Sequence, residues 1–253
     1  MTHDQQNAFS RTYGQAHAMA TLVARTQQAR RHPYAFAASI VFCTPLIGAL
    51  TPAQALEAGD RLLRFGPTVV APNDDSGPLT LNGDSFAPAG AVGVKNGAAL
   101  SISATYMVSS NVGVELLAAT PFRHDVTLAS VGTIAETQQL PPTLSLQWHF
   151  DTPGPVRPYL GAGINYTTFF NSKTKGALRD DLGFTRISLK DSVGWSLQAG
   201  LDIDLNDRWF VGASLYYMAI DTTATIRNPQ GDTLRVNVDI DPWAIMLGAG
   251  VRF

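Results

Sequence analysis

Apolar side chains alternate with small or polar ones along the last eleven residues of the chain, 243–253. The apolar set occupies every second position from Trp243 to Phe253. A period of two places this set on one face of a strand and the remaining residues on the other face. The stretch has the length of a strand that crosses a bilayer at a tilt, about 9–11 residues. With its C-terminal phenylalanine, it favours the closing strand of an outer-membrane β-barrel over the last strand of a soluble sandwich.

The same alternation recurs along most of the chain after residue 59. In residues 193–203, Val, Trp, Leu, Ala, Leu and Ile alternate with Gly, Ser, Gln, Gly and Asp. Such alternation indicates strands with one apolar and one polar face. The pattern predicts eight strands, at about 60–72, 93–108, 111–122, 140–151, 157–169, 188–204 and 208–221, and a last strand that closes at Phe253.

The lengths of the connections predict how these strands are joined. Short connections at 109–111, 151–155 and 206–207 alternate with long ones at about 73–92, 122–139, 170–187 and 222–238. All short turns therefore lie at one end of the strands and all long loops at the other. The sequence predicts an all-β fold, an eight-stranded antiparallel up-and-down transmembrane β-barrel with short periplasmic turns and long extracellular loops.

Aromatic residues occur at two levels of the predicted strands. A barrel in a bilayer carries an aromatic girdle at each interface. Aromatic residues are also common in strands of any kind, but their placement at two levels favours girdles. The turn-end set is Tyr106, Trp148, Trp209 and Phe253, and the loop-end set is Tyr166, Trp195, Tyr217 and Trp243.

An export signal is expected near the N-terminus. Residues 33–56 contain no charge, three arginines precede them, and the motif Ala53-Gln54-Ala55 offers a small-residue cleavage site. A basic region, an apolar core and a cleavage site in this order are typical of a secretory signal peptide. Pro45 and the cleavage motif argue against the alternative, a transmembrane helix. We therefore expect a signal peptide over residues 25–55.

Cleavage there divides the chain into three parts. Residues 1–24 are an N-terminal extension unless Met19 is the true start, residues 25–55 are removed, and residues 56–253 form the barrel. The barrel part has 14 Lys and Arg against 19 Asp and Glu, a formal charge of −5, which argues against nucleic acid as a partner. The single cysteine, Cys43, falls in the removed part. No later window holds about 18 consecutive apolar residues, so no spanning helix is expected.

Short strings along nearly the whole barrel part match one known family, in order. The strongest is Pro158-Tyr-Leu-Gly-Ala-Gly-Ile-Asn-Tyr-Thr-Thr-Phe-Phe170. Others are Gly59-Asp60 with Arg64, Pro72-Asn-Asp74, Thr120-Pro-Phe-Arg-His-Asp125, Gln139-Leu-Pro-Pro-Thr143, Ala199-Gly-Leu-Asp202, Asp239-Ile-Asp-Pro-Trp243 and the terminal Gly-Val-Arg-Phe. By these strings the chain resembles the OmpW family of small outer-membrane β-barrel proteins, which includes AlkL-like members. The family often reads Asp-Ser-Trp-Gly entering its sixth strand, where this chain has Asp191-Ser-Val-Gly194.

The resemblance implies a location, a function and partners. It implies a protein of the outer membrane of a Gram-negative bacterium. It also implies a narrow hydrophobic channel that passively admits small apolar molecules and releases them sideways into the membrane. The expected partners are outer-membrane lipids, small hydrophobic molecules and the barrel-assembly machinery, which would recognise the C-terminal Phe253. No nucleic acid and no cofactor is expected.

The loop-end half of the lumen is predicted to be apolar, which is unusual because barrel interiors are mostly polar. Methionine suits an adaptable site because its side chain is flexible and polarizable. The residues alone leave open whether these side chains line a ligand channel or pack a plugged lumen, and the resemblance favours the channel. The expected lining is Val70, Leu117, Phe169, Phe170, Leu178, Leu189, Met218 and Ile220.

The turn-end half of the lumen is predicted to be a polar plug. It consists of Arg64, Glu115, Gln147, His149, Asp202 and Arg252. Charges in a narrow interior should be paired, so Arg64 or Arg252 is expected to pair with Glu115 or Asp202. A polar floor would make an apolar guest leave sideways between strands. Pro67 is a candidate weak point, because proline donates no ladder hydrogen bond.

Two other classes of function remain as alternatives. A catalytic barrel needs a nucleophile within reach of a base, but Ser145 and His149 are separated by roughly 13 Å along one strand. No metal-ligand spacing or phosphate-binding glycine loop is present, so we expect no catalytic residue, no metal site and no enzymatic activity. The main alternative to a channel is a structural or adhesive barrel with a plugged lumen, and the lesser one is a lipid-modifying enzyme.

Overall fold

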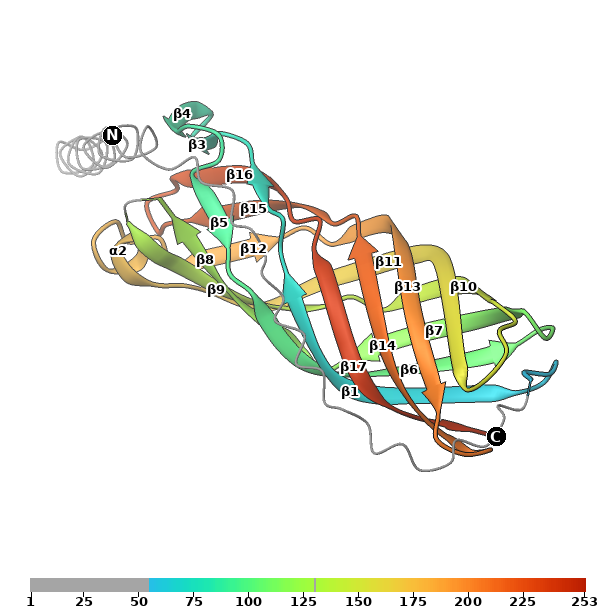
Figure 1. Cartoon of the computed structure of the whole chain (residues 1–253). Coiled ribbons are helices and arrows are strands. Elements are labelled where there is room, and N and C mark those ends of the chain that lie inside the picture. The colour runs from blue at the N-terminus through green and yellow to red at the C-terminus, as the bar shows by residue number, and fades with distance from the viewer. Residues whose placement is uncertain (1–54, 130) are drawn as a thin grey trace, which may run out of the picture.

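The computed structural model describes residues 55–129 and 131–253. The predicted signal peptide and N-terminal extension lie outside the described residues, apart from Ala55. The described chain is elongated and nearly all-β, with a barrel at one end and further strands beyond it (Figure 1). Its described helix, α2 (Gly176–Asp180), is short. No helix within the described ranges is long and apolar enough to cross a membrane.

Eight antiparallel strands form the barrel, as predicted. β1 pairs with β17, so the first and last barrel strands meet, and β10 pairs with β11 to complete the closure. The order around the barrel is β10 (Thr143–His149), β7 (Val112–Ala119), β6 (Gly97–Met107), β1 (Arg61–Ala71), β17 (Trp243–Arg252), β14 (Trp209–Met218), β13 (Ser192–Asp204) and β11 (Val156–Thr174).

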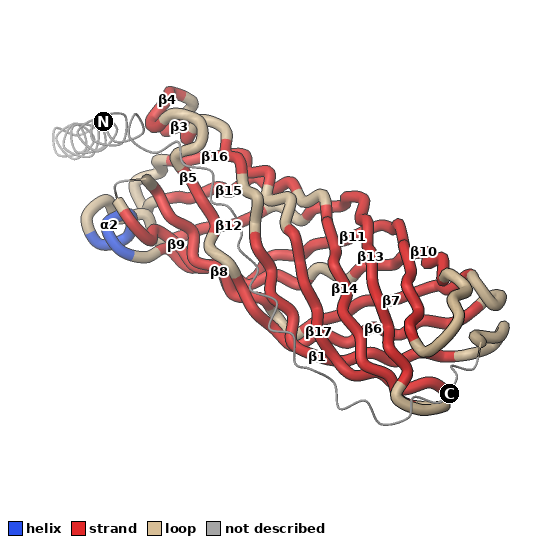
Figure 2. The backbone as a smooth tube through the Cα atoms, in the orientation of Figure 1, coloured by secondary structure: helices blue, strands red, loops and turns tan. Residues whose placement is uncertain are grey.

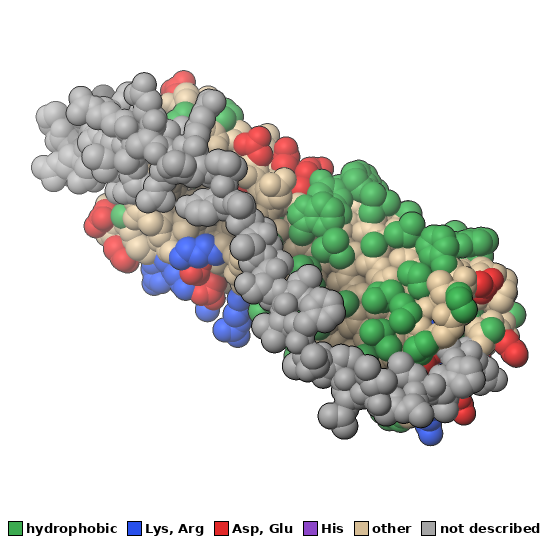
Figure 3. Space-filling view, viewed as in Figure 1, with side chains coloured by type: hydrophobic (Ala, Val, Ile, Leu, Met, Phe, Trp, Pro, Cys, Tyr) green, Lys and Arg blue, Asp and Glu red, His purple; other side chains and the backbone are tan. Residues whose placement is uncertain are grey.

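The barrel strands carry their apolar face outwards. In β10, Leu144, Leu146 and Trp148 are more than half exposed, while the alternate positions from Thr143 to His149 are buried. The same inversion on the other strands produces the apolar band over the barrel in Figure 3. An exposed apolar band of this kind is unfavourable in water and favourable in the hydrocarbon core of a bilayer. At the outer edge of this band the Tyr217 ring packs against Trp195 on one side and Trp243 on the other, in tilted pairs with ring centroids 5.1 Å apart.

The short turns lie together at the end opposite the outer strands, as the connection lengths predict. Asn206 fixes one of them, because its Oδ1 accepts the backbone N–H groups of Arg208 and Trp209 at 3.0 and 2.9 Å. This is an Asx turn, in which a side-chain oxygen takes the place of the backbone carbonyl of an ordinary turn. In another turn the Ser109 hydroxyl accepts the N–H of Val112 at 3.1 Å.

The four long connections contain much more strand than the sequence analysis assigned to them (Figure 2). β8 and β9 form a hairpin that continues the sheet of β11, and β15 and β16 form a second hairpin in a separate sheet. In these segments polar residues face outwards and apolar residues face inwards. The alternation is clearest in β16, where Leu234, Val236 and Val238 are buried. The additional strands are β2 (Asp75–Ser76), β3 (Leu79–Leu81), β4 (Asp84–Ala87), β5 (Val92–Val94), β8 (Phe122–Leu128), β9 (Gly132–Leu140), β12 (Arg186–Leu189), β15 (Asp221–Arg227) and β16 (Thr233–Asp239).

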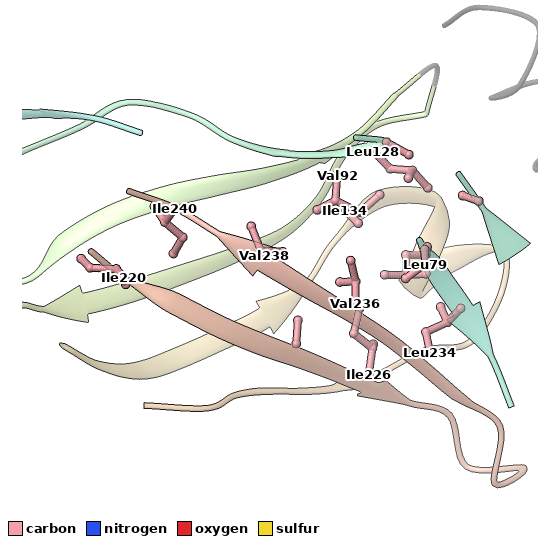
Figure 4. Close-up of a cluster of buried hydrophobic side chains, with 14 of the residues drawn as sticks. Leu79, Val92, Leu128, Ile134, Ile220, Ile226, Leu234, Val236, Val238 and Ile240 are labelled. Carbon is pink, nitrogen blue, oxygen red and sulfur yellow. The ribbon is translucent and has the colours of Figure 1, made fainter. Parts of the chain in front are cut away.

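The outer part is two sheets with an apolar core between them. One sheet continues the barrel through β11, β9, β8 and β5, and the other has the order β12, β15, β16, β3 and β4, with β2 also on β16. Figure 4 shows side chains of β15 and β16 facing Val92, Leu128 and Ile134 of the opposite sheet. The core is continuous with the loop-end half of the barrel, since Val70, Leu117 and Met218 belong to the same cluster.

Prolines mark the junction between the barrel and the outer part. Pro121 separates β7 from β8, the pair Pro141-Pro142 separates β9 from β10, and Pro242 separates β16 from β17. Proline has no N–H to donate, so the ladder cannot run through these positions unbroken. Asn165 on the neighbouring strand β11 binds the kink, because its amide donates to the Pro141 carbonyl at 3.2 Å and to Thr143 Oγ1 at 2.9 Å.

Candidate functional site

An ion-paired group closes the turn-end half of the lumen. Arg64 of β1 reaches across the barrel and binds Asp202 of β13 with two hydrogen bonds, Nη2–Oδ2 at 2.7 Å and Nε–Oδ1 at 3.2 Å. Its Nη1 donates to Thr105 Oγ1 at 2.9 Å and lies 3.8 Å from Glu115 Oε1. All four side chains are almost fully buried. Arg64 therefore pairs with both of the acids that the sequence offered it.

Aromatic rings hold the Arg64 guanidinium on the remaining sides. Its Cζ lies 4.9 Å from the centre of the Tyr159 ring and 5.5 Å from that of Phe210. Arg157, which sequence reasoning missed, lies 5.5 Å from the same Phe210 ring and pairs with Asp204 at 2.5 Å. Parity on β11 does place Arg157 inwards, but its position beside the turn concealed it. Cation–π contacts of this kind add to the ion pairs and fill the lumen with side chains.

Two further plug residues join the same polar network, while Arg252 does not. Gln147 Oε1 accepts from Thr105 Oγ1 at 3.2 Å and lies 3.1 Å from His149 Nε2. Arg252 instead binds Asp60 at 2.9 Å, at the rim of the barrel near the C-terminus. Of the two arginines named as candidate partners of Glu115 and Asp202, Arg64 is the one that lies beside these acids. Arg252 is the last residue of its strand, at the turn end of the barrel.

A first apolar cavity lies directly above the plug. Four of the eight predicted lining residues, Val70, Leu117, Met218 and Ile220, border it, and its volume is about 20 Å³. We call this the lower cavity. Its wall is completed by residues of the junction, Phe122, Gln139, Pro141 and Pro242 among them. The parity rule therefore placed these four inward side chains together correctly.

A second apolar cavity, the upper cavity, lies between the two outer sheets. Its volume is about 40 Å³, and Phe169 and Leu189 of the predicted lining border it. Gln139 borders both cavities, so the two are neighbours along the lumen. Most of the wall comes from segments interpreted as loops, and the missed signal was the alternation within residues 234–238. These additional lining residues include Val126 and, labelled in Figure 4, Ile134, Ile226, Val236, Val238 and Ile240.

Two predicted lining residues lie elsewhere. Phe170 pairs with Gln138, whereas Phe169 pairs with Gln139, whose side chain faces the cavity. Neighbours on a strand face opposite sides, so Phe170 is on the outer face of β11, beside a bulge. Leu178 lies in α2, where it is buried in the common core but does not border either cavity.

His124 of β8 is the ionisable group in the wall of the upper cavity, beside the polar residues Thr137, Gln139 and Thr222. Its Nδ1 lies 2.7 Å from the Lys95 carbonyl oxygen, and its Nε2 lies 3.1 Å from the Gln139 side-chain nitrogen. Both contacts suit a neutral ring that donates from Nδ1 and accepts at Nε2, a tautomer assigned from these partners. Burial lowers the pKa of His124 below its usual value, and the hydrogen bond to Lys95 opposes this only in part.

Acidification is therefore expected to weaken the outer sheet. The folded state binds a proton at His124 less readily than the unfolded state, so stability is complete above the unfolded pKa of about 6.5 and is lost as the pH falls below it. Protection of β5 and β8 amides, corrected for intrinsic exchange, should fall between about pH 7 and pH 5. In His124→Gln this loss should disappear, and an unchanged loss in that variant would contradict the assignment.

The fold and site together define a small outer-membrane β-barrel whose lumen is closed by ion pairs on one side and apolar on the other. A model of the OmpW family matches residues 57–253. The chain therefore belongs to the OmpW family, and its place is the bacterial outer membrane.

Known relatives agree with this assignment. Outer membrane protein W of Salmonella typhimurium is 42% identical over 85% of this chain and 97% of its own length. The dibenzothiophene metabolism operon protein PahQ of Pseudomonas aeruginosa is 29% identical over 85% of this chain and 98% of its own. The crystal structure of the outer membrane protein OprG from Pseudomonas aeruginosa superposes with a TM-score of 0.73 at 37% identity, covering 79% of this chain and 99% of that one.

The site is free of any recognisable catalytic or metal-binding group within the described ranges. No set of three or more His, Cys, Asp or Glu residues there is placed to hold a metal ion. His149 is engaged with Gln147, two residues along its own strand, and is not hydrogen-bonded to a hydroxyl.

Proposed function

We propose that this barrel passively admits small apolar molecules from outside the cell and releases them sideways into the outer membrane. The observation that carries the proposal is the pair of apolar cavities stacked above an ion-paired floor. An apolar guest gains by leaving water for such a lining. The buried charges below it oppose further descent, because the guest cannot replace their hydrogen bonds.

Passage requires side chains to move. A single water needs roughly 10–15 Å³ measured in the same way, so the cavities have room for only a few waters and neither admits an organic molecule without widening. Met218 in the lower cavity has three rotatable side-chain bonds and can adapt to different guests. The name of the relative PahQ refers to dibenzothiophene metabolism, and dibenzothiophene is a small apolar aromatic compound, in keeping with the chemistry of the lining.

The seam between β1 and β17 is the proposed exit. Their register pairs stop at Phe65↔Ala249 and resume at Thr68↔Met246, leaving Gly66 and Pro67 between. A hollow of about 10 Å³, bordered by Arg64, Met246 and Gly248, lies inside the barrel behind this interruption. The strands remain in contact, since a Cβ on Gly66 would meet the Leu247 carbonyl oxygen at 2.0 Å. Release therefore requires them to part.

The remaining proposals concern partners and chemistry. Phe253 is 60% exposed at the periplasmic end, where the barrel-assembly machinery can reach it. We also infer that the barrel has no catalytic activity of its own. The two alternatives, an adhesive barrel and a lipid-modifying enzyme, require neither cavity.

Uptake of a fluorescent apolar probe into vesicles tests the proposed function. Vesicles with the protein should accumulate the probe faster than vesicles without it. Leu117→Asp with Met218→Asp should reduce this uptake severalfold while the barrel stays folded. A carboxylate in the lower cavity holds water, and an apolar guest would have to displace that water at a cost in free energy. Leu144→Asn with Leu146→Asn, on the lipid-facing side, is a control for lost stability. Uptake that does not depend on the protein would reject the proposal, and normal uptake by the aspartate variant would reject the lining.

A further inference from the structure

The lower cavity is not apolar on every side. Thr68 of β1 and Tyr216 of β14 both border it, and they are 4% and 1% exposed. Neither Thr68 Oγ1 nor Tyr216 Oη has a hydrogen-bond partner among the described residues. Ser214 lies within reach of the Tyr216 hydroxyl, but no hydrogen bond of good geometry joins them, and the Ser214 hydroxyl binds Tyr159 at 2.7 Å. Ser101, also buried, adds a third hydroxyl residue to the wall. The Thr68 and Tyr216 hydroxyls have almost no accessible area in the closed cavity, so a guest reaches them only when the lining moves.

Such hydroxyl groups are costly unless something binds them. A buried polar group without a partner loses about 1–3 kcal/mol relative to its hydrogen bonds with water. Each hydroxyl can both donate and accept, so the neutral oxygen-bearing group of a guest can bind either of them. The lower cavity, at about 20 Å³, already has room for a group the size of a hydroxyl, since a single water needs roughly 10–15 Å³ measured in this way.

The two hydroxyl groups approach the cavity from either side of β17. Thr68 pairs with Met246, and Tyr216 pairs with Ala244, two residues further along the same strand. The apolar lining, with Leu117, Met218 and Ile220, continues from there to Gln139 and the upper cavity. A guest would thus have its polar end beside Thr68 and Tyr216 and its apolar body directed towards the outside.

The charge below the cavity restricts which polar end is accepted. Glu115 lies two residues before Leu117, on the same inward face of β7. Its carboxylate oxygens have no hydrogen-bond partner among the described residues, and the nearest cation, Arg64, already binds Asp202. A second carboxylate beside Glu115 would be repelled. The site therefore favours neutral groups over acids.

We propose that Thr68 and Tyr216 form a polar subsite that holds the hydroxyl or carbonyl group of a neutral amphiphile, so that the cargo includes alcohols, aldehydes and ketones with an apolar body. This inference rests on the proposed function and names the cargo more narrowly. Purely apolar molecules pass through the same cavities without this added contact.

Titration of the protein in lipid nanodiscs tests the subsite. The probes are n-octane, 1-octanol and octanoate, compared at equal mole fraction in the bilayer, and the reporter is the ¹³C-labelled methyl group of Met218. 1-Octanol should bind about fivefold more tightly than octane, as expected from one hydrogen bond gained in a buried site. Octanoate at neutral pH should bind more weakly than 1-octanol.

Tyr216→Phe with Thr68→Val should abolish the preference for 1-octanol, so that 1-octanol and octane bind the variant equally well. Tyr217→Phe, a change of the same kind at the adjacent outward residue, should keep the preference. Equal binding of the two probes by the wild type, or a preference that survives in the double variant, would mean that the hydroxyls bind only water, and would overturn the inference. If octane itself does not shift the Met218 signal, the proposed function fails instead.

Discussion

Arg64→Met is expected to lower the free energy of unfolding by about 3–5 kcal/mol, the usual effect of breaking a buried ion pair from one side. The substitution leaves two acids, Asp202 and Glu115, buried in the lumen without their cation. It also removes the donor to Thr105 and the guanidinium that lies over Tyr159. Urea unfolding in lipid vesicles, followed by tryptophan fluorescence, measures the change.

Two comparisons make this prediction specific to the plug. Arg252→Met removes an arginine whose partner Asp60 lies at the rim, and should lower the free energy of unfolding less than Arg64→Met does, because it leaves one acid rather than two without its cation. Adding Asp202→Asn and Glu115→Gln to Arg64→Met removes the unpaired charges and should restore part of the loss. If Arg64→Met and Arg252→Met were equally stable, the plug would not be the main polar support of the lumen.

Locking the seam between β1 and β17 is expected to slow probe uptake by about tenfold or more, which corresponds to a barrier raised by roughly 1.4 kcal/mol. Val69 and Ile245 are a register pair just above the interruption, and both face outwards. Antiparallel pairs have Cα separations of about 4.5–5.5 Å, within the range that a disulfide accepts. Val69→Cys with Ile245→Cys should therefore form a bridge on oxidation.

A matched bridge elsewhere separates exit from general rigidity. Leu160 and Ala199 are an outward register pair on β11 and β13, where the ladder is continuous. Oxidised Leu160→Cys with Ala199→Cys should keep normal uptake, and reduction should restore uptake in the first variant. Residues 56–253 contain no other cysteine. Normal uptake through the oxidised seam would move the exit to another pair of strands.

The membrane part of this protein was predictable because lipid and lumen impose a simple rule. Every second residue of a barrel strand must be apolar towards lipid, and Leu144, Leu146 and Trp148 follow this rule without exception. Alternation also fixes which residues face inwards, so Arg64, Asp202 and Glu115 could be named as neighbours. The partner of Arg252 could not be named, because the level of a residue within the barrel depends on strand register, which parity does not give.

The outer sheets were less predictable for a physical reason. Their outward faces meet water, so residues such as Arg123, Arg235 and Asn237 alternate with apolar ones in short segments that resemble loops. Phe170 shows a second limit. The alternation predicts a strand that ends at about residue 169 and leaves Phe170 in a loop, whereas β11 continues to Thr174, and parity along it turns Phe170 outwards beside Phe169. The full extent of the strands therefore had to be known before the whole cavity wall could be assembled.

The proline junction has a consequence for motion. β11 passes this level as a single strand of 19 residues, whereas prolines separate β7 from β8, β9 from β10 and β16 from β17. Cooperative opening tends to follow units whose hydrogen-bond ladders are continuous. The outer half can thus loosen about β11 as a hinge while the embedded half keeps its shape. Local opening of the outer sheets therefore does not require the membrane-embedded barrel to open.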